Sequence, residues 1–194
     1  MRNNKRTNIG IVKMIAVLFL AVCMMTGTFT KTVQATPAAG QGLDAKVSEI
    51  VSKKLKSSDT GKKKLKKLFT YIQKQYDYGR KVGFEAYNGW EKDYALEMLN
   101  DKKGSCYHYA AAYAFLAKKA TGYNVRIGVG QTNGFSGSFQ PHAWVEVEMN
   151  SKWYICDPNM DKYAADSSKK YCVKKRNSLK DTYNKFKDTK YYNL

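Results

Sequence analysis

The apolar stretch Gly104–Leu116 constrains the fold more than any other part of the sequence. Ser105 is a favoured N-cap residue, and the apolar residues after it recur with helical spacing. We therefore predict a buried helix over about Ser105–Lys119. Cys106 falls in its first turn, where unpaired backbone N–H groups and the positive end of the helix dipole favour a thiolate. This stretch predicts a central helix that begins with a reactive cysteine.

A cysteine nucleophile needs a base, and the chain has only two histidines, His108 and His142. His108 follows Cys106 by two residues, which turns it about 200° around the helix axis and away from the thiol. His142 begins a predicted strand over His142–Met149. We therefore expect His142, brought in from a distant part of the sequence, to act as the base.

The predicted hairpin after this strand sets an acid beside the base. If Asn150-Ser151 is a two-residue turn and Lys152–Cys156 the returning strand, Asp157 lies opposite Trp144. Side chains alternate along a strand, so Asp157 and His142 share one face as diagonal neighbours, within about 8 Å between their Cα atoms. A three-residue loop would instead place them on opposite faces.

Three short motifs carry a family resemblance. Gly104-Ser105-Cys106 opens a helix, His142-Ala143-Trp144 opens a strand, and Trp153–Pro158 closes the next strand. Together they resemble the secreted bacterial branch of the transglutaminase-like superfamily over about Leu65–Tyr163. The resemblance implies an α+β fold of the papain-like, transglutaminase-core type. In such a fold, helices that include a central nucleophile helix pack on a small antiparallel sheet.

The resemblance also assigns roles to individual residues. It implies acyl transfer on amides by a catalytic site of Cys106, His142 and Asp157. The backbone N–H of Cys106 is the natural donor to an oxyanion, since it lies at a helix start. Aromatic residues are expected to line the substrate cleft, with packing in the core as the alternative role for each of them: Tyr78, Trp90 and Trp144.

The first 35 residues read as a signal peptide. They contain no acidic residue, begin with basic residues and carry an apolar run, Met14–Met25, that is too short to span a bilayer. Cleavage is expected after Ala35, and Cys23 offers a lipoprotein alternative. Residues 36–42 read as a linker and residues 43–194 as a single transglutaminase-like domain with its core at about 65–163. The protein is therefore expected to be secreted, extracellular or attached to the cell surface.

The charge of the chain bears on its partners. The formal net charge is +18, and loss of the leader leaves +13. Such a charge favours contact with an anionic cell surface, although a solvated basic surface explains it equally well. Nucleic acid is not expected as a partner, because no recognition motif occurs. The expected partner is a protein or peptide substrate, with cell-wall peptide as one option, and the protein is expected to be monomeric.

The cysteines and histidines do not form a metal motif. Three cysteines follow the leader, and Cys156 and Cys172 either form a disulfide or stay reduced while Cys106 is free. Cys106, His108 and His142 lack the spacing of metal ligands, so neither a metal nor another cofactor is expected.

Other parts of the chain are assigned from their periodicity. Helices are predicted over about Leu43–Lys56, Gly61–Tyr76 and Asp93–Leu99, and a strand over about Val125–Gly130. Gln131–Gln140 is expected to be a loop at the rim of the substrate groove. The basic segment after Tyr163 has no assigned structure.

These observations favour a secreted thiol enzyme. Hydrolysis of peptide or isopeptide bonds is preferred, because water is abundant outside a cell and no acidic calcium-binding loop is visible. The alternatives are a protein-crosslinking transglutaminase, an amidase acting on peptidoglycan stem peptides, and an inactive module of the same fold that binds the cell surface or wall.

Overall fold

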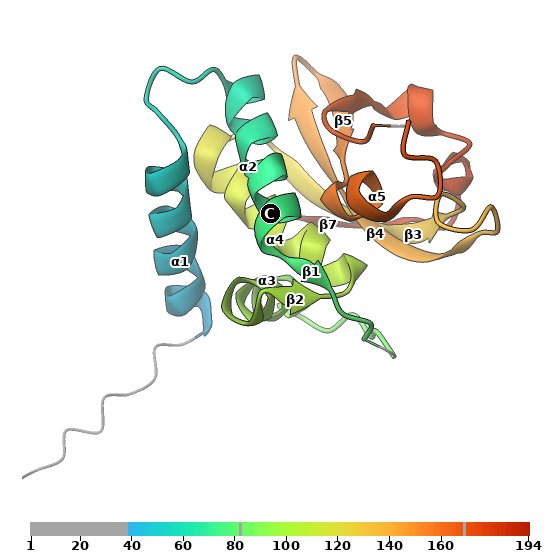
Figure 1. The fold of residues 1–194 in the computed structure, drawn as a ribbon, viewed down its shortest axis with the longest axis horizontal. Helices are drawn as coiled ribbons and strands as arrows, with labels where there is room; N and C mark the ends of the chain where they lie inside the picture. The colour runs from blue at the N-terminus through green and yellow to red at the C-terminus, as the bar shows by residue number, and fades with distance from the viewer. Residues whose placement is uncertain (1–38, 82, 169) are drawn as a thin grey trace, which may run out of the picture. The chain divides into compact units, whose positions relative to one another are not determined.

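An antiparallel sheet packs against a layer of helices in the computed structural model, which describes residues 39–81, 83–168 and 170–194 (Figure 1). The predicted signal peptide, residues 1–35, lies outside the described residues. Helix α1 begins at Ala39, inside the predicted linker. Among the described residues, no helix combines the length and apolar character needed to cross a membrane.

The helices in the described residues are α1 (Ala39–Lys54), α2 (Gly61–Gln75), α3 (Trp90–Asp101), α4 (Cys106–Thr121) and the short α5 (Pro158–Tyr163). Four of them lie where the periodicity predicts them, and the short α5 was not predicted. Helix α3 is longer than predicted at both ends. Helix α4 begins just after its N-cap Ser105 and ends at Gly122, whose φ of 69° is the left-handed conformation that favours glycine.

Helix α4 is the centre of the domain. It contacts α1, α2, α3 and α5 as well as strands β3 and β4. Its alanines allow this close approach from several sides, because Ala110, Ala111, Ala112 and Ala114 present little bulk and are fully buried. The predicted central helix that begins at Cys106 is therefore observed.

Five strands form the main sheet in the order β6-β5-β4-β3-β7. The strands are β3 (Val125–Thr132), β4 (Gln140–Met149), β5 (Lys152–Cys156), β6 (Lys174–Lys175) and β7 (Lys190–Asn193), and every pairing is antiparallel. A separate parallel pair joins β1 (Asp77–Tyr78) to β2 (Lys103–Gly104), which leads directly into α4. The predicted combination of helices and an antiparallel sheet is confirmed.

The hairpin between β4 and β5 has the predicted two-residue turn. Asn150 and Ser151 have φ angles of 51° and 56°, as a tight hairpin turn requires, and Met149 pairs with Lys152. The predicted register is confirmed, because this pairing continues to Val145 opposite Cys156.

Strand β4 is buried on both faces. Ala143, Val145 and Val147 pack in the core shared with the helices, whereas Trp144 belongs to a second apolar cluster. The segment after Tyr163 contributes Tyr171, Leu179 and Tyr183 to this cluster. The same segment carries β6, β7 and the short 3-10 helices η1 (Arg176–Leu179) and η2 (Asn184–Phe186). The segment without a predicted structure thus supplies the cover for the face of β4 that carries His142.

Candidate active site

Cys106 is the first residue of α4 and sits where two pockets meet. Cys106 is only 7% exposed, yet it lines both pockets. The approach of β2 is possible because Gly104 has no side chain: a Cβ there would lie 2.5 Å from Cβ of His108 and 2.9 Å from the sulfur of Met98. The local sequence thus packs the chain tightly just before the thiol.

His142 and Asp157 form a buried hydrogen-bonded pair. Nε2 of His142 lies 2.7 Å from Oδ2 of Asp157, and the two side chains are 0% and 1% exposed. The same oxygen accepts a hydrogen bond of 2.8 Å from the hydroxyl of Tyr183. The other oxygen, Oδ1, accepts one of 2.9 Å from the backbone N–H of Met160 in α5. Both carboxylate oxygens are therefore held in place.

The surroundings of His142 favour its charged form. Burial by itself disfavours the charge, but the negative charge of Asp157, its hydrogen bond and the Cys106 sulfur outweigh burial and raise the pKa of His142 to about 10. Nδ1 makes no hydrogen bond to the described residues, although the thiol is close enough to influence the ring. The free nitrogen is thus available to Cys106, while the other is engaged by Asp157.

Aromatic rings hold the imidazole in its orientation. Phe135, from the loop between β3 and β4, meets His142 edge to face with 5.3 Å between ring centroids. Trp144 and Tyr183 lie nearly parallel to it, at interplanar angles of 23° and 25°. Rotation of the imidazole away from the thiol would have to displace these rings.

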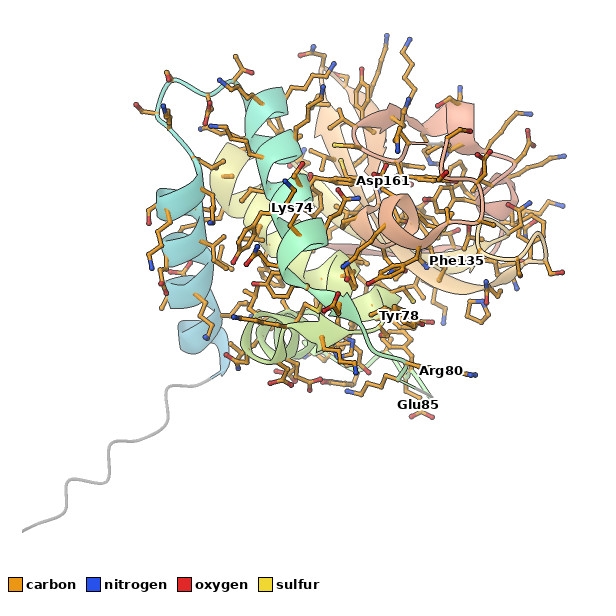
Figure 2. All side chains as sticks on the ribbon, in the orientation of Figure 1. Lys74, Tyr78, Arg80, Glu85, Phe135 and Asp161 are labelled. Carbon is orange, nitrogen blue, oxygen red and sulfur yellow. The ribbon has the colours of Figure 1, made fainter. Side chains whose placement is uncertain are left out.

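The two pockets form the two sides of a cleft around Cys106. They share Tyr78, Cys106, Gln140 and Pro141. The pocket of about 320 Å³, here called the imidazole-side pocket, adds His142 and three further residues: Phe135, Asn159 and Tyr163. The pocket of about 530 Å³, here called the basic pocket, adds another six: Arg80, Lys81, Gly83, Phe84, Ser105 and Tyr107. Figure 2 labels Tyr78, Arg80 and Phe135, which come from the segment beginning at β1 and from the β3–β4 loop.

The structure brings together only part of the predicted site. Cys106, His142 and Asp157 converge, and Tyr78 is 43% exposed at the junction of the two pockets. The loop over residues 131–140 is shorter than expected, since β3 continues to Thr132, but it does supply Phe135 to the pocket.

Trp90 and Trp144 do not line the cleft, which corrects their prediction as substrate-binding residues. Both are 0% exposed. Trp90 packs edge to face against Phe84 and Tyr192, and Trp144 donates its indole N–H to Glu146 over 3.1 Å. Burial of a large aromatic side chain contributes more to stability than burial of a small one. Both tryptophans therefore pack in the core and not at the surface of the cleft.

Sequence reasoning missed several residues of this site, and three of them lie next to the acid or the imidazole. Tyr183, which donates to Asp157, is 26 residues away in the unassigned segment and has no local motif. Phe135 and Asn159 line the imidazole-side pocket. The sequence contains a signal for Asn159: it directly follows Asp157-Pro158, and a residue so near in the sequence lies close to the acid.

The three described cysteines are free thiols. Cys156 and Cys172 form no disulfide, and burial is the main cause that raises the pKa of each, to about 11 and about 12. No cluster of metal-binding side chains occurs within the described residues.

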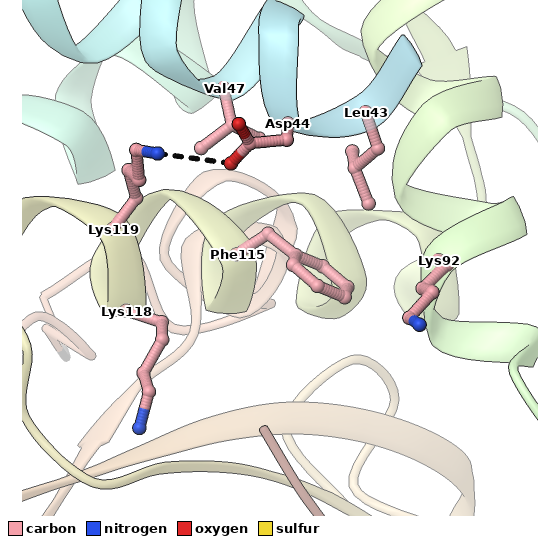
Figure 3. Close-up of a pocket in the computed structure, with 7 residues that line it drawn as sticks. All are labelled: Leu43, Asp44, Val47, Lys92, Phe115, Lys118 and Lys119. Atoms are coloured by element: carbon pink, nitrogen blue, oxygen red, sulfur yellow. Dashed lines mark hydrogen bonds and ion pairs between the residues drawn. The ribbon is translucent and has the colours of Figure 1, made fainter. Parts of the chain in front are cut away.

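Another pocket, of about 380 Å³, lies away from Cys106 and has no catalytic side chains of this kind (Figure 3). It lies between α1, α3 and α4, with an apolar floor of Leu43, Val47 and Phe115. Lysines surround it, and Lys119 pairs with Asp44 at 3.0 Å. No histidine or cysteine lines it, so the cleft at Cys106 is the candidate active site.

One protein family matches more than half of this chain. The sequence profile of the transglutaminase-like superfamily matches residues 45–158, which include all three converging residues. No curated protein matches the chain.

Two solved structures are similar at low sequence identity. One is a candidate cysteine protease from Cytophaga hutchinsonii, with 13% identity and a TM-score of 0.49 over 81% of this chain and 49% of that one. The other is a TGase, with 18% identity and a TM-score of 0.44 over 67% of this chain and 35% of that one. The chain therefore matches half or less of the length of these proteins.

Proposed function

Because the chain belongs to the transglutaminase-like superfamily, we propose that it is a cysteine-dependent enzyme that cleaves peptide or isopeptide bonds through a thioester on Cys106. The observation that carries this proposal is the buried His142–Asp157 pair, whose second imidazole nitrogen is left free beside the thiol at the start of α4. A nucleophile, a base and an orienting acid are the minimum set for this chemistry.

The first half of the reaction forms the thioester. In the resting pair, the imidazolium of His142 holds the proton of Cys106 on Nδ1. The thiolate attacks the carbonyl carbon of the amide. The backbone N–H of Cys106 donates to the oxyanion; a single donor of this kind is typically worth about 3 kcal/mol. The tetrahedral intermediate then collapses, the C–N bond breaks, and the imidazolium gives its proton to the leaving amine.

The second half of the reaction releases the acyl group. Neutral His142 takes a proton from water, the resulting hydroxide attacks the thioester carbonyl, and the carboxylic acid leaves as the thiolate reforms. Asp157 stabilises the imidazolium in both halves, since its carboxylate stays hydrogen-bonded to Nε2. If an amine replaces water as the acceptor, the same steps produce a crosslink.

Crosslinking is the alternative with a specific feature in its favour. The imidazole-side pocket is the place for the leaving or entering amine, because His142 must exchange protons with that group. At about 320 Å³ and with apolar walls, this pocket has room for the side chain of an acceptor lysine. Hydrolysis remains the preferred outcome, because the cleft also opens to solvent through the exposed Tyr78 edge.

We also propose that the enzyme acts outside the cell or at its surface, on protein or peptide substrates that include cell-wall peptide. The charge of +13 that remains after loss of the leader supports attraction to an anionic surface. Cell fractionation tests the location. Release of the protein from isolated walls by salt tests the attraction, since screening weakens exposed charge contacts. An inactive wall-binding module would bind walls in the same way but show no reactive thiol.

The decisive experiment compares wild type with Cys106→Ala on a glutamine- or lysine-linked reporter peptide, with and without hydroxylamine. Release of free acid indicates hydrolysis, and hydroxamate indicates acyl transfer to an amine. Cys172→Ala is the matched control, because it removes a thiol outside the cleft. Equal turnover by wild type and Cys106→Ala would refute the thioester mechanism.

A further inference from the structure

His108 is a buried histidine for which the proposed reaction has no use. It is 4% exposed and lies on α4, two residues after the nucleophile. Its Nε2 lies 3.0 Å from Oε2 of Glu97 on α3. Its Nδ1 lies 3.2 Å from the backbone nitrogen of Ser105 and 2.9 Å from the Ser105 hydroxyl. A chain of hydrogen bonds therefore runs from Glu97 through His108 to the residue before Cys106.

The hydrogen bonds identify the tautomer of His108. A backbone N–H can only donate, so Nδ1 must accept the bond from Ser105 and carry no proton. The ring proton is then on Nε2, where it is donated to the carboxylate of Glu97. This is the capping-box arrangement with histidine at the third helical position, where glutamate or glutamine is usual.

The arrangement acts on the geometry of the nucleophile. Ser105 is the N-cap of α4, and its orientation sets the direction of the backbone N–H and side chain of Cys106. The His108 ring also fills the space beside Gly104, where a Cβ would lie 2.6 Å from Cγ of the imidazole. There is thus little room for Gly104, the residue before Ser105, to move while the ring is in place.

We propose that His108 is a positioning residue: its neutral ring, held by Glu97, fixes Ser105 and through it the Cys106 sulfur and oxyanion donor, and protonation of the ring releases them. The inference rests on the proposed function. It adds a second histidine to the site, with a role opposite to that of His142: one must carry charge for the reaction, and the other must be neutral.

The groups around His108 support a neutral ring at neutral pH. Burial is the main cause that lowers the pKa of His108 below its ordinary value, and Lys81 acts in the same direction. Glu97 and Asp101 oppose this effect. Tyr94 packs on the ring with 4.3 Å between centroids, and Arg80 and Lys103 line the pocket of about 450 Å³ at this edge, together with His108.

Protonation would bring two donors together. A proton on Nδ1 would face the backbone N–H of Ser105, which can only donate, and the Ser105 hydroxyl would have to turn from donor to acceptor. The Ser105 N–H would then lose its acceptor as acid charges the ring. We therefore expect acid to impair the site through His108 and Ser105.

The test measures alkylation of Cys106 by iodoacetamide in the full chain from about pH 4 to pH 9, for wild type, His108→Gln and His108→Ala. Cys156→Ser and Cys172→Ser in every protein leave Cys106 as the reactive thiol of the described domain. Glutamine accepts the Ser105 N–H and does not titrate. Its rate at neutral pH should stay within about twofold of wild type, while the acid loss of reactivity moves to lower pH. His108→Ala should be about five- to tenfold slower at every pH above the acid limb.

Glu97→Gln provides a second arm that leaves Ser105 and the ring intact. Removing a negative charge lowers the pKa of His108 further, so the acid limb should again move to lower pH. It also covers the case in which His108→Ala fails to fold, which circular dichroism would reveal.

Acid limbs that coincide in wild type, His108→Gln and Glu97→Gln would overturn the inference, as would equal slowing by glutamine and alanine. These results differ from failure of the proposed function, in which Cys106 of wild type itself reacts no faster than a free thiol.

Discussion

The imidazole of His142 and the carboxylate of Asp157 meet at 2.7 Å across a hairpin whose two-residue turn determines that they share a face. With one more residue in that turn, every side chain of β5 would point to the other face of the sheet. The acid–base pair of the candidate site thus depends on the left-handed conformations of Asn150 and Ser151.

Asp157→Asn should reduce kcat on a peptide substrate by about 10³-fold, because an amide no longer stabilises the imidazolium or selects its tautomer. Pre-steady-state kinetics would locate the loss in thioester formation. Tyr183→Phe is the control: it removes one of the bonds to Asp157 and keeps the charge, so its loss should stay within about tenfold. Comparable losses in both variants would contradict the assigned role of the Asp157 charge.

Folding stability should depend on His142 at alkaline pH. Because its pKa rises from an ordinary value of 6.5 to about 10 in the folded protein, the native state retains a proton that the unfolded chain has lost. The stabilisation is therefore complete below about pH 6.5 and is lost as the pH rises toward 10. Urea titrations of wild type and His142→Gln at several pH values would measure this effect. Identical pH dependence in the two proteins would contradict the raised pKa.

Asn159→Ala should reduce kcat/KM by about tenfold without loss of stability. The side-chain amide is buried at the wall of the imidazole-side pocket, and neither its oxygen nor its nitrogen has a partner among the described residues. Rotation of this amide, whose last torsion is broad, would allow a substrate peptide group to pair with it. Steady-state kinetics and thermal unfolding measure the two effects. A variant that loses stability but keeps kcat/KM would show a purely structural amide.

Alanine substitutions of Tyr78 and Trp90 should have different effects, one on substrate binding and the other on stability. Tyr78→Ala, at an exposed edge of the cleft, should raise KM several-fold and change the free energy of unfolding by less than about 1 kcal/mol. Trp90→Ala should cost about 3–5 kcal/mol, because it leaves a cavity between α3 and its aromatic neighbours. Chemical denaturation and KM measurements on both variants provide the comparison. An unchanged KM in Tyr78→Ala would remove Tyr78 from the substrate site.

Local sequence signals determined the helix that begins at Cys106, the strand that carries His142 and the two-residue turn that aligns Asp157 with it, although this strand begins at Gln140, two residues earlier than predicted. Each depends on neighbours within a few residues: an N-cap, an alternating pattern and two residues that tolerate positive φ. Their pairing across the hairpin follows from the period of a strand.

Only the tertiary structure decided which aromatic residues face the substrate and what covers the acid. Trp90 and Tyr78 are both aromatic residues that precede Cys106 in the sequence, but packing buries Trp90 and leaves Tyr78 exposed at the cleft. Tyr183 reaches Asp157 from a segment without periodicity, and Glu97 reaches His108 from another helix. Such contacts join residues far apart in the chain, so no local pattern records them, and they exist only once the layers have packed together.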